Sequence, residues 1–201
     1  MLNCIHNLVF YTIFSHFAKK CGIQVIGLCI MVDHIHALII PKSKKQMSEF
    51  ILLYSSLFAR LYNKDKGRTG RLFEKSFGSA IAYLFNNPVE KKLCKQAEEY
   101  RWNFLKYASG QYPFSSDTKL NKASPGLRRA IKIVNICINS KGYLGYQILE
   151  SIFQKLNIDE KAQIADYIIT AFSPFDYNAT TAYFGTYDKM VMAINANTNN
   201  R

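Results

Sequence analysis

Residues 23–40 read IQVIGLCIMVDHIHALII, and this stretch decides the fold. It holds two apolar runs rich in β-branched residues, at residues 23–32 and 34–40, with Asp33 as the only turn residue between them. Runs of this length and composition are typical of strands. The stretch therefore predicts a tight antiparallel hairpin, and Pro41, which cannot donate a ladder hydrogen bond, ends its second strand.

Two histidines stand at the head of the second predicted strand. Residues two apart on a strand point to the same face, so His34 and His36 can reach one divalent ion while Ile35 packs into the core. Alternating polar residues are also ordinary on a half-exposed strand, so the pair alone leaves a structural role open. Cys29 lies nearby, but no second soft ligand has a spacing that suits zinc.

Helical patterns flank the hairpin. Residues 2–20 carry apolar groups at a period near 3.6, and Gly22 ends this predicted helix. Ser43 and Gln46 form a capping-box pattern before a second helix with one apolar face, which reaches Leu61.

The middle of the chain is less regular. Residues 63–70 predict a polar, basic loop bounded by glycine, residues 71–77 a weak strand, and residues 80–85 a short helix. Asn87 is placed to cap a further helix, with Glu90 at its third position, that runs to about Lys106.

Beyond a segment rich in serine, glycine and proline, only helices are expected. They are predicted at residues 127–138, 143–156, 159–172 behind an Asn157-x-x-Glu160 capping box, and 180–194. The predicted fold class is α+β, with a central antiparallel sheet flanked by helices and an all-helical C-terminal extension. The predicted division is a domain at 1–110, a linker at 111–126 and the extension at 127–201.

Positive charge is concentrated in the first half of the chain. The net charge is +12; residues 1–114 hold 16 basic and 7 acidic side chains, which gives +9, and residues 115–201 hold 10 and 7, which gives +3. A basic surface of this kind often binds a phosphate backbone, because each neutralised phosphate releases a counterion. A solvated basic surface is the alternative.

Basic side chains gather in the predicted loop and its borders, where they could follow a DNA backbone. They are Lys64, Lys66, Arg68 and Arg71. The neighbouring aromatic residues Tyr62 and Phe73 could stack on unpaired bases.

Composition also sets the expected location. No apolar stretch near the start approaches the ~20 residues that a membrane span needs, and no signal-peptide pattern is evident. Five scattered cysteines indicate reduced thiols rather than a disulfide framework. We therefore expect a cytoplasmic protein without a membrane partner.

Four stretches, taken in order, resemble one family. Residues 29–40, CIMVDHIHALII, resemble the histidine-hydrophobic-histidine motif of the single-tyrosine HUH transposases, in particular the REP-associated tyrosine transposases. The other stretches are GRTGRLF at 67–73, similar to the family's basic loop, YLFNNPV at 83–89, similar to its nucleophile helix, and EYRW at 99–102, similar to its closing segment. The resemblance covers residues 20–110.

This resemblance implies a metal-dependent enzyme that cleaves and rejoins single-stranded or hairpin DNA. Tyr83 would be the nucleophile and would form a 5′-phosphotyrosine intermediate, while His34 and His36 would bind Mg²⁺ or Mn²⁺. Asn87, four residues after Tyr83, would share its helical face and serve either as a third metal ligand or as a helix N-cap.

Two other functions compete with the enzyme. One is a catalytically silent DNA-binding regulator that keeps the transposase fold, and the other is a small metal-binding protein unrelated to DNA, which the charge distribution disfavours. His34, His36 and Tyr83 together favour the enzyme, because a pure binder has no need of all three. The short connection from Phe77 to Tyr83 leaves open whether Tyr83 meets the histidines of its own chain, those of a partner in a homodimer, or neither.

Overall fold

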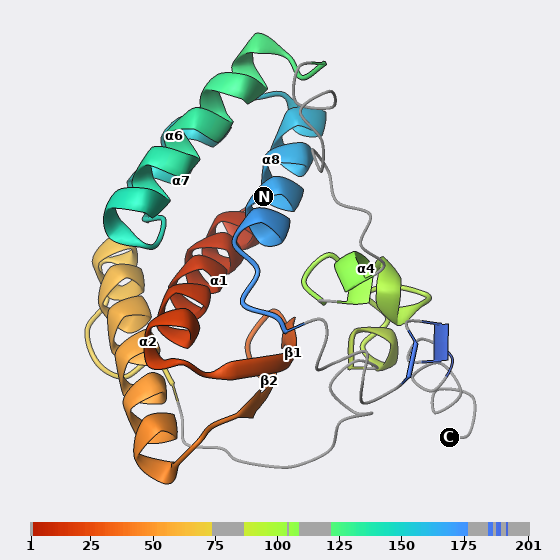
Figure 1. The fold of residues 1–201 in the computed structure, drawn as a ribbon. Helices are drawn as coiled ribbons and strands as arrows, with labels where there is room; N and C mark the ends of the chain where they lie inside the picture. Colours follow the sequence, from red (N-terminus) through yellow and green to blue (C-terminus); the bar gives the residue numbers. More distant parts are fainter. Residues whose placement is uncertain are drawn as a thin grey trace. The chain divides into compact units, whose positions relative to one another are not determined.

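The computed structural model describes residues 2–73, 87–103, 105–108, 122–176, 185–186, 188–189 and 192 (Figure 1). These residues form two compact units, each assembled from segments that are far apart in the sequence. The first unit holds five helices: α1 (Leu2–Cys21), α2 (Lys44–Lys66), α6 (Pro125–Lys141), α7 (Tyr146–Gln154) and α8 (Ile158–Ala171). The second holds strands β1 (Gln24–Ile30) and β2 (Ile35–Ile40), the 3₁₀ helix η1 (Ala97–Glu99), the short helix α4 (Leu105–Ala108) and residues 175–176.

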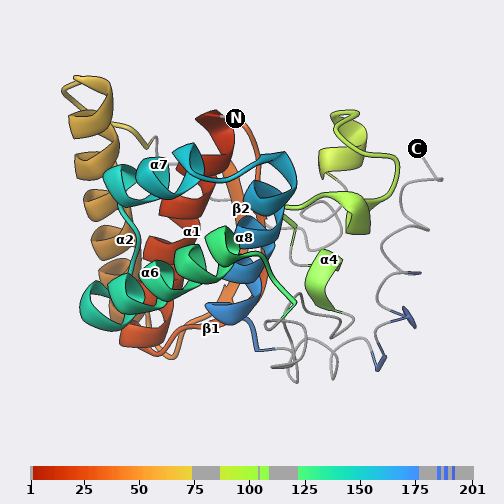
Figure 2. The same ribbon diagram turned by 90° about the horizontal axis from the view of Figure 1, so that it is seen from above.

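Helix α1 is the centre of the first unit. It packs against α2, α7 and α8, as Figure 2 shows, and its middle is fully buried. Phe14 on α1 meets Phe50 on α2 with ring centroids 5.1 Å apart in an edge-on arrangement. Each buried phenylalanine contributes about 1.5–3 kcal/mol through the area that it removes from water, so this aromatic contact ties α2 firmly to α1.

Hydrogen bonds join α1 to the C-terminal helices. The Tyr11 hydroxyl donates to the Ile169 carbonyl at 2.7 Å, and the Leu144 amide donates to Thr12 Oγ1 at 3.1 Å. Tyr11 and Thr12 are both buried, so each bond satisfies a polar group that would otherwise cost about 1–3 kcal/mol. The C-terminal helices therefore share one core with α1.

Two helices begin at the caps that the sequence predicts. Ser43 Oγ accepts from the Gln46 amide at 3.1 Å, while the Gln46 side chain donates to the Cys21 carbonyl instead of closing the capping box. At α8, Asn157 and Glu160 form the complete reciprocal box, with both bonds at 2.9 Å.

The second unit is built on the antiparallel pair β1–β2. Cys29 faces His36 and Ile30 faces Ile35 across the pair, and Met31 N donates to His34 O at 2.8 Å to close a two-residue turn. Strand β1 is buried along nearly its whole length.

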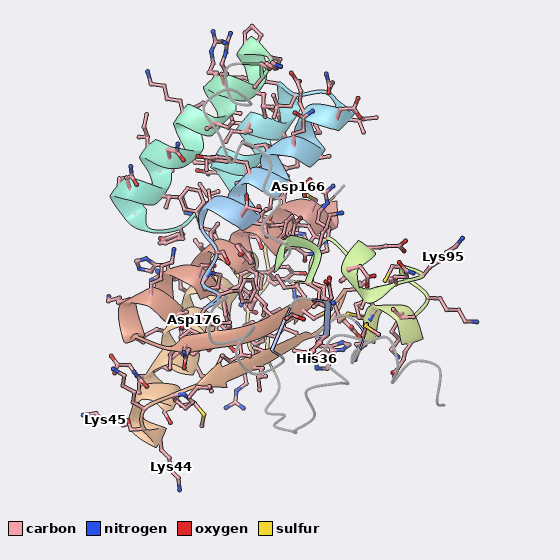
Figure 3. The ribbon with its side chains drawn as sticks, turned by 45° about the vertical axis from the view of Figure 1, so that its right-hand side comes forward. His36, Lys44, Lys45, Lys95, Asp166 and Asp176 are labelled. Atoms are coloured by element: carbon pink, nitrogen blue, oxygen red, sulfur yellow. The ribbon has the colours of Figure 1, made fainter. Side chains whose placement is uncertain are left out.

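Two other segments lie along β1 in this unit. Ile30 N donates to Trp102 O at 3.0 Å, and the Tyr100 hydroxyl donates to Ile30 O at 3.0 Å. Near the other end of the strand, Asp176 N donates to Val25 O at 3.1 Å, and Figure 3 labels Asp176 beside the sheet. The stretch at 99–102 that resembles a closing segment therefore does pair with the hairpin.

Most of the predicted elements are confirmed. The structure has the α+β class, the helix at 2–20, the hairpin, the helix behind Ser43 and the three helices between 127 and 172. The second strand begins at Ile35, one residue later than predicted. The weak strand at 71–77, the short helix at 80–85 and the helix at 180–194 lie wholly or mostly outside the described residues, as does most of the linker at 111–126. The predicted domain division stays a prediction.

The prediction of one helix from Asn87 to Lys106 is wrong. Residues 87–90 are helical, but Lys92 takes a left-handed φ of 56°, and the chain continues through turns and η1. The Glu99 carboxylate accepts from the amides of Lys95 and Gln96 at 3.1 and 3.2 Å and so stabilises the start of η1. Asn87 is itself helical and is not the N-cap.

The predicted loop at 63–70 is shorter than expected. Helix α2 continues to Lys66, so Lys64 and Lys66 lie in its last turn, where positive charge complements the helix dipole. Gly67, with φ 60°, ends the helix in the left-handed conformation.

Within the described ranges, no helix combines the length and the apolar character that crossing a membrane requires.

We predict that Gly142→Ala destabilises the protein far more than Gly67→Ala. Both glycines end a helix with positive φ, but a Cβ at Gly142 would overlap the imidazole of His16, whereas a Cβ at Gly67 meets no atom within 4 Å. Urea unfolding should show a loss of about 1–2 kcal/mol for Gly67→Ala and about 2–5 kcal/mol for Gly142→Ala. Adding His16→Ala to Gly142→Ala should recover part of the loss, and equal losses for the two glycines would contradict the packing described here.

Candidate functional site

His34 and His36 lie together at the turn end of the hairpin. Their ring centroids are 4.7 Å apart and the ring planes are nearly perpendicular, at 89°. His36 is on β2, as Figure 3 shows, and His34 is the last residue of the turn, where its carbonyl accepts from Met31 N. Ile35 between them pairs with Ile30 of β1. The structure thus confirms that the two imidazoles lie close together.

Asp33 orients the first imidazole. His34 Nδ1 lies 2.6 Å from Asp33 Oδ1, and this hydrogen bond holds the pKa of Asp33 below its ordinary value. When Nδ1 carries the donated proton, Nε2 keeps its lone pair and can bind a cation. From the sequence, Asp33 is predicted only as a turn residue, although an acid directly before a histidine pair is a signal that could have indicated this role.

Asn87 contacts the second imidazole from a segment 51 residues away. Asn87 is 1% exposed, and its Nδ2 lies 2.8 Å from His36 Nε2. Its Oδ1 is buried and has no hydrogen-bond partner among the described residues. A buried amide oxygen without a partner costs about 1–3 kcal/mol, so its position beside the histidines requires an explanation.

Burial keeps His36 in the form that binds metals. Desolvation lowers the pKa of His36 below 6.5, and the neighbouring His34 lowers it further. The imidazole is therefore mostly neutral at pH 7. Neutral imidazole is the ligand form, because a protonated ring has no free lone pair.

These groups fit a divalent ion held in an open site. The candidate donors are the two imidazoles and the Asn87 amide oxygen. Because His36 Nε2 accepts from Asn87 Nδ2 in this structure, an ion at His36 requires the amide to turn so that Oδ1 takes the place of Nδ2. The described residues contain no group of three or more His, Cys, Asp and Glu side chains that could hold a metal. An ion held by three protein donors would keep positions for water and substrate oxygens, as ions in catalytic sites do. Cys29, opposite His36, is buried and has its pKa raised to about 12, so it remains a thiol at neutral pH.

The predicted DNA-binding residues gather at the end of α2. All four are exposed: Lys64, Lys66, Arg68 and Arg71. Asn63 Nδ2 donates to Gly70 O at 2.9 Å and thereby shapes the loop that follows the helix. The basic residues belong to the first unit, whereas the histidines and Asn87 belong to the second.

Several of these side chains are also engaged within the protein. Lys66 Nζ lies 2.9 Å from Asp65 Oδ2, which raises the pKa of the lysine. Arg68 lies over the Tyr62 ring, 5.9 Å from its centroid. Phe73 packs against Phe58 with ring centroids 6.0 Å apart. Base stacking by the two aromatic residues stays a prediction.

Tyr83 lies outside the described residues, which stop at Phe73 and resume at Asn87. The structure therefore brings together His34, His36 and Asn87, and the role of Tyr83 stays a prediction.

Comparison with known proteins places the first half of the chain in a family. A family model described as "Transposase IS200 like" matches residues 2–101, which include α1, the hairpin, α2 and Asn87. Neither the curated proteins nor the solved structures give a significant match.

We predict that His36 titrates below pH 6.5 in the metal-free protein and that Asn87→Ala raises its pKa. The alanine opens the ring to water and weakens the desolvation that lowers the pKa. Asn87→Leu is the matched control, because it also loses the amide hydrogen bond but keeps the ring covered, so the pKa should rise less than in Asn87→Ala. Imidazole chemical shifts followed by NMR across pH would measure all three proteins, and a His36 pKa above 6.5 in the unaltered protein would contradict the burial described here.

Proposed function

The chain belongs to the family of IS200-like transposases, and on that premise we propose that it nicks and rejoins single-stranded or hairpin DNA through a covalent tyrosine intermediate. The family makes it a transposase, with DNA as its partner. The observation that carries the proposal is that His36 contacts both His34 and Asn87. These contacts bring together two separate parts of the matched segment. A cytoplasmic location and a homodimer stay predictions.

We propose that the ligands of a divalent ion are His34, His36 and Asn87 Oδ1, with the Asn87 amide turned so that Oδ1 takes the place of Nδ2 beside the His36 ring. The bound ion would polarise a phosphoryl oxygen and stabilise charge on the leaving oxygen. Asp33 would hold the His34 ring with Nε2 available, and burial would keep His36 neutral. Imidazole suits Mn²⁺ better than Mg²⁺, which prefers oxygen ligands, so we expect Mn²⁺ to support the reaction at the lower concentration.

The proposed nucleophile is the Tyr83 hydroxyl. Its oxygen would attack a backbone phosphorus, the bond from phosphorus to the 3′ oxygen would break, and that oxygen would leave as a 3′ hydroxyl after taking a proton from solvent. The phenol proton would pass to solvent in exchange. The resulting 5′-phosphotyrosine keeps the ester bond, so a 3′ hydroxyl can reverse the step and rejoin the strand without ATP. The four-residue spacing to Asn87 predicts that Tyr83 shares a helical face with it.

The basic residues at the end of α2 would bind the DNA backbone. Lys64, Arg68 and Arg71 are exposed and close together along the chain, and arginine and lysine at such positions contact phosphates without reading sequence. They would hold the strand while the histidine site acts on it.

We predict that His34→Ala and His36→Ala each abolish metal-dependent cleavage while DNA affinity remains. Each change removes one of two imidazole ligands, whereas phosphate contacts come mainly from the basic residues. Cleavage of a labelled single strand in Mg²⁺ or Mn²⁺ and its binding in EDTA would be measured side by side. Normal cleavage by the double alanine variant would place the metal site elsewhere.

We predict that Tyr83→Phe abolishes covalent attachment to DNA. The change deletes one oxygen and keeps the ring, so packing and DNA binding should change little while the nucleophile is lost. A denaturing gel after incubation with a labelled strand and Mn²⁺ should show an adduct on the 5′-phosphate side for the unaltered protein and none for the variant.

A matched tyrosine keeps this experiment specific. Tyr143→Phe changes a tyrosine between α6 and α7, outside the segment that the family model covers, and should still form the adduct. An adduct that persists in Tyr83→Phe would mean that another tyrosine attacks. DNA binding with neither adduct nor nicking from the unaltered protein would instead support the silent regulator.

A further inference from the structure

Helix α6 presents a basic face to solvent. Leu127, Ala130, Ile131 and Val134 bury one side of this helix. Arg128, Arg129 and Lys132 are exposed and fall on the opposite side, because positions one and four apart cover an arc of roughly 100° on a helix. The three basic side chains therefore form one continuous surface, which we call the α6 basic face.

The helix that carries this face has no acidic residue. Between Pro125 and Lys141 it holds four basic side chains and neither aspartate nor glutamate. The acids of residues 122–176 lie on α7, on α8 and at Asp176. Among the described residues, Arg129 and Lys132 form no ion pair. The charge is thus segregated rather than balanced, which differs from an ordinary solvated helix that mixes both signs.

The first turn of α6 carries no acidic side chain, and Arg128 and Arg129 directly follow it. Acids are the residues preferred in a first turn, because they complement the positive end of a helix. The opposite end carries Lys141, which suits the dipole. A local choice that works against helix stability is expected where a side chain serves binding.

The face is held in place by its attachment to α8. Asn135 Oδ1 accepts from the Tyr167 hydroxyl at 2.9 Å, and Ser124 caps α6 by accepting from the Leu127 amide at 3.1 Å. Ser124 also donates to the Glu160 carboxylate on α8. The basic side chains therefore project from a helix that is fixed at its start and in its middle.

We propose that the α6 basic face binds the phosphate backbone of DNA and adds a contact outside the segment that defines the family. The proposal rests on the proposed function, since it assumes that the protein binds DNA. The family model ends at residue 101 and α6 begins at Pro125, so the match does not assign this surface. A polyanion is the partner that fits, because it neutralises three positive charges with no acid among them.

The test compares two variants that remove equal charge. The first is Arg128→Gln, Arg129→Gln and Lys132→Gln. The second is the control, Lys141→Gln, Lys155→Gln and Lys189→Gln, which changes three exposed lysines that are not part of the basic face. Binding of a labelled DNA hairpin with a single-stranded flank would be measured in EDTA at several salt concentrations, and far-UV circular dichroism would check that both variants fold.

The slope of log affinity against log salt gives the number of phosphates contacted. Each lost phosphate contact lowers the slope by about 0.7–0.9, so the basic-face variant should lose about 2–3 units of slope and bind at least about tenfold more weakly near 0.1 M salt. The control should keep a slope within about one unit of that of the unaltered protein. Arg129→Gln and Lys132→Gln tested singly should each lose about one unit.

The outcomes separate this proposal from the proposed function. If the unaltered protein binds DNA and the basic-face variant keeps the slope of the control, the α6 basic face is not a DNA contact, and the histidine site is unaffected by that result. If the unaltered protein binds no DNA, both proposals are overturned.

Discussion

The register of the β1–β2 hairpin is the constraint on which the candidate site depends. Side chains alternate between the two faces of a strand, so a slip of one residue would turn His36 away from its present neighbours. The two-residue turn closed by Met31 and His34 fixes this register, and Trp102 and Tyr100 hold β1 from its other edge. Those contacts link the closing stretch of the matched segment to the same hairpin that carries the histidines. The geometry of the site is therefore a property of the whole second unit.

Polar side chains are buried at the turn end of the hairpin, although burying them costs folding free energy. Asn87 is buried with an amide oxygen that has no partner in the described part of the chain, and burial favours the neutral form of His36. An apolar side chain at position 87 would avoid the cost of the orphaned oxygen. Folded proteins accept such costs mainly at functional sites, and a cation shared by the imidazoles and the amide oxygen would offset this one. Asp33 adds a further requirement, because its carboxylate sets which nitrogen of His34 is available.

Local signals predicted much of the structure, whereas contacts between distant residues could not be predicted. The hairpin, α1 and the caps at Ser43 and Asn157 follow from composition, periodicity and side-chain chemistry within a few residues. The prediction of a helix from Asn87 to Lys106 was wrong, because a capping pattern alone does not supply the apolar face that holds a helix in place. The contact between Asn87 and His36 spans 51 residues, and that between Tyr11 and Ile169 spans 158. Residues so far apart form no local sequence pattern from which the contact could be predicted. The pair of histidines was found because both lie on one short segment.

Pulsed electron paramagnetic resonance of the Mn²⁺-loaded protein can determine whether His34 and His36 bind the same divalent ion, as we propose. Nitrogen nuclei bound to Mn²⁺ give measurable couplings, so ligands can be counted without reference to activity or to DNA. We expect couplings from two imidazole nitrogens, of which His34→Ala and His36→Ala each remove one. A Mn²⁺ signal without imidazole nitrogen, or one that both substitutions leave unchanged, would mean that the two histidines are not the ligands.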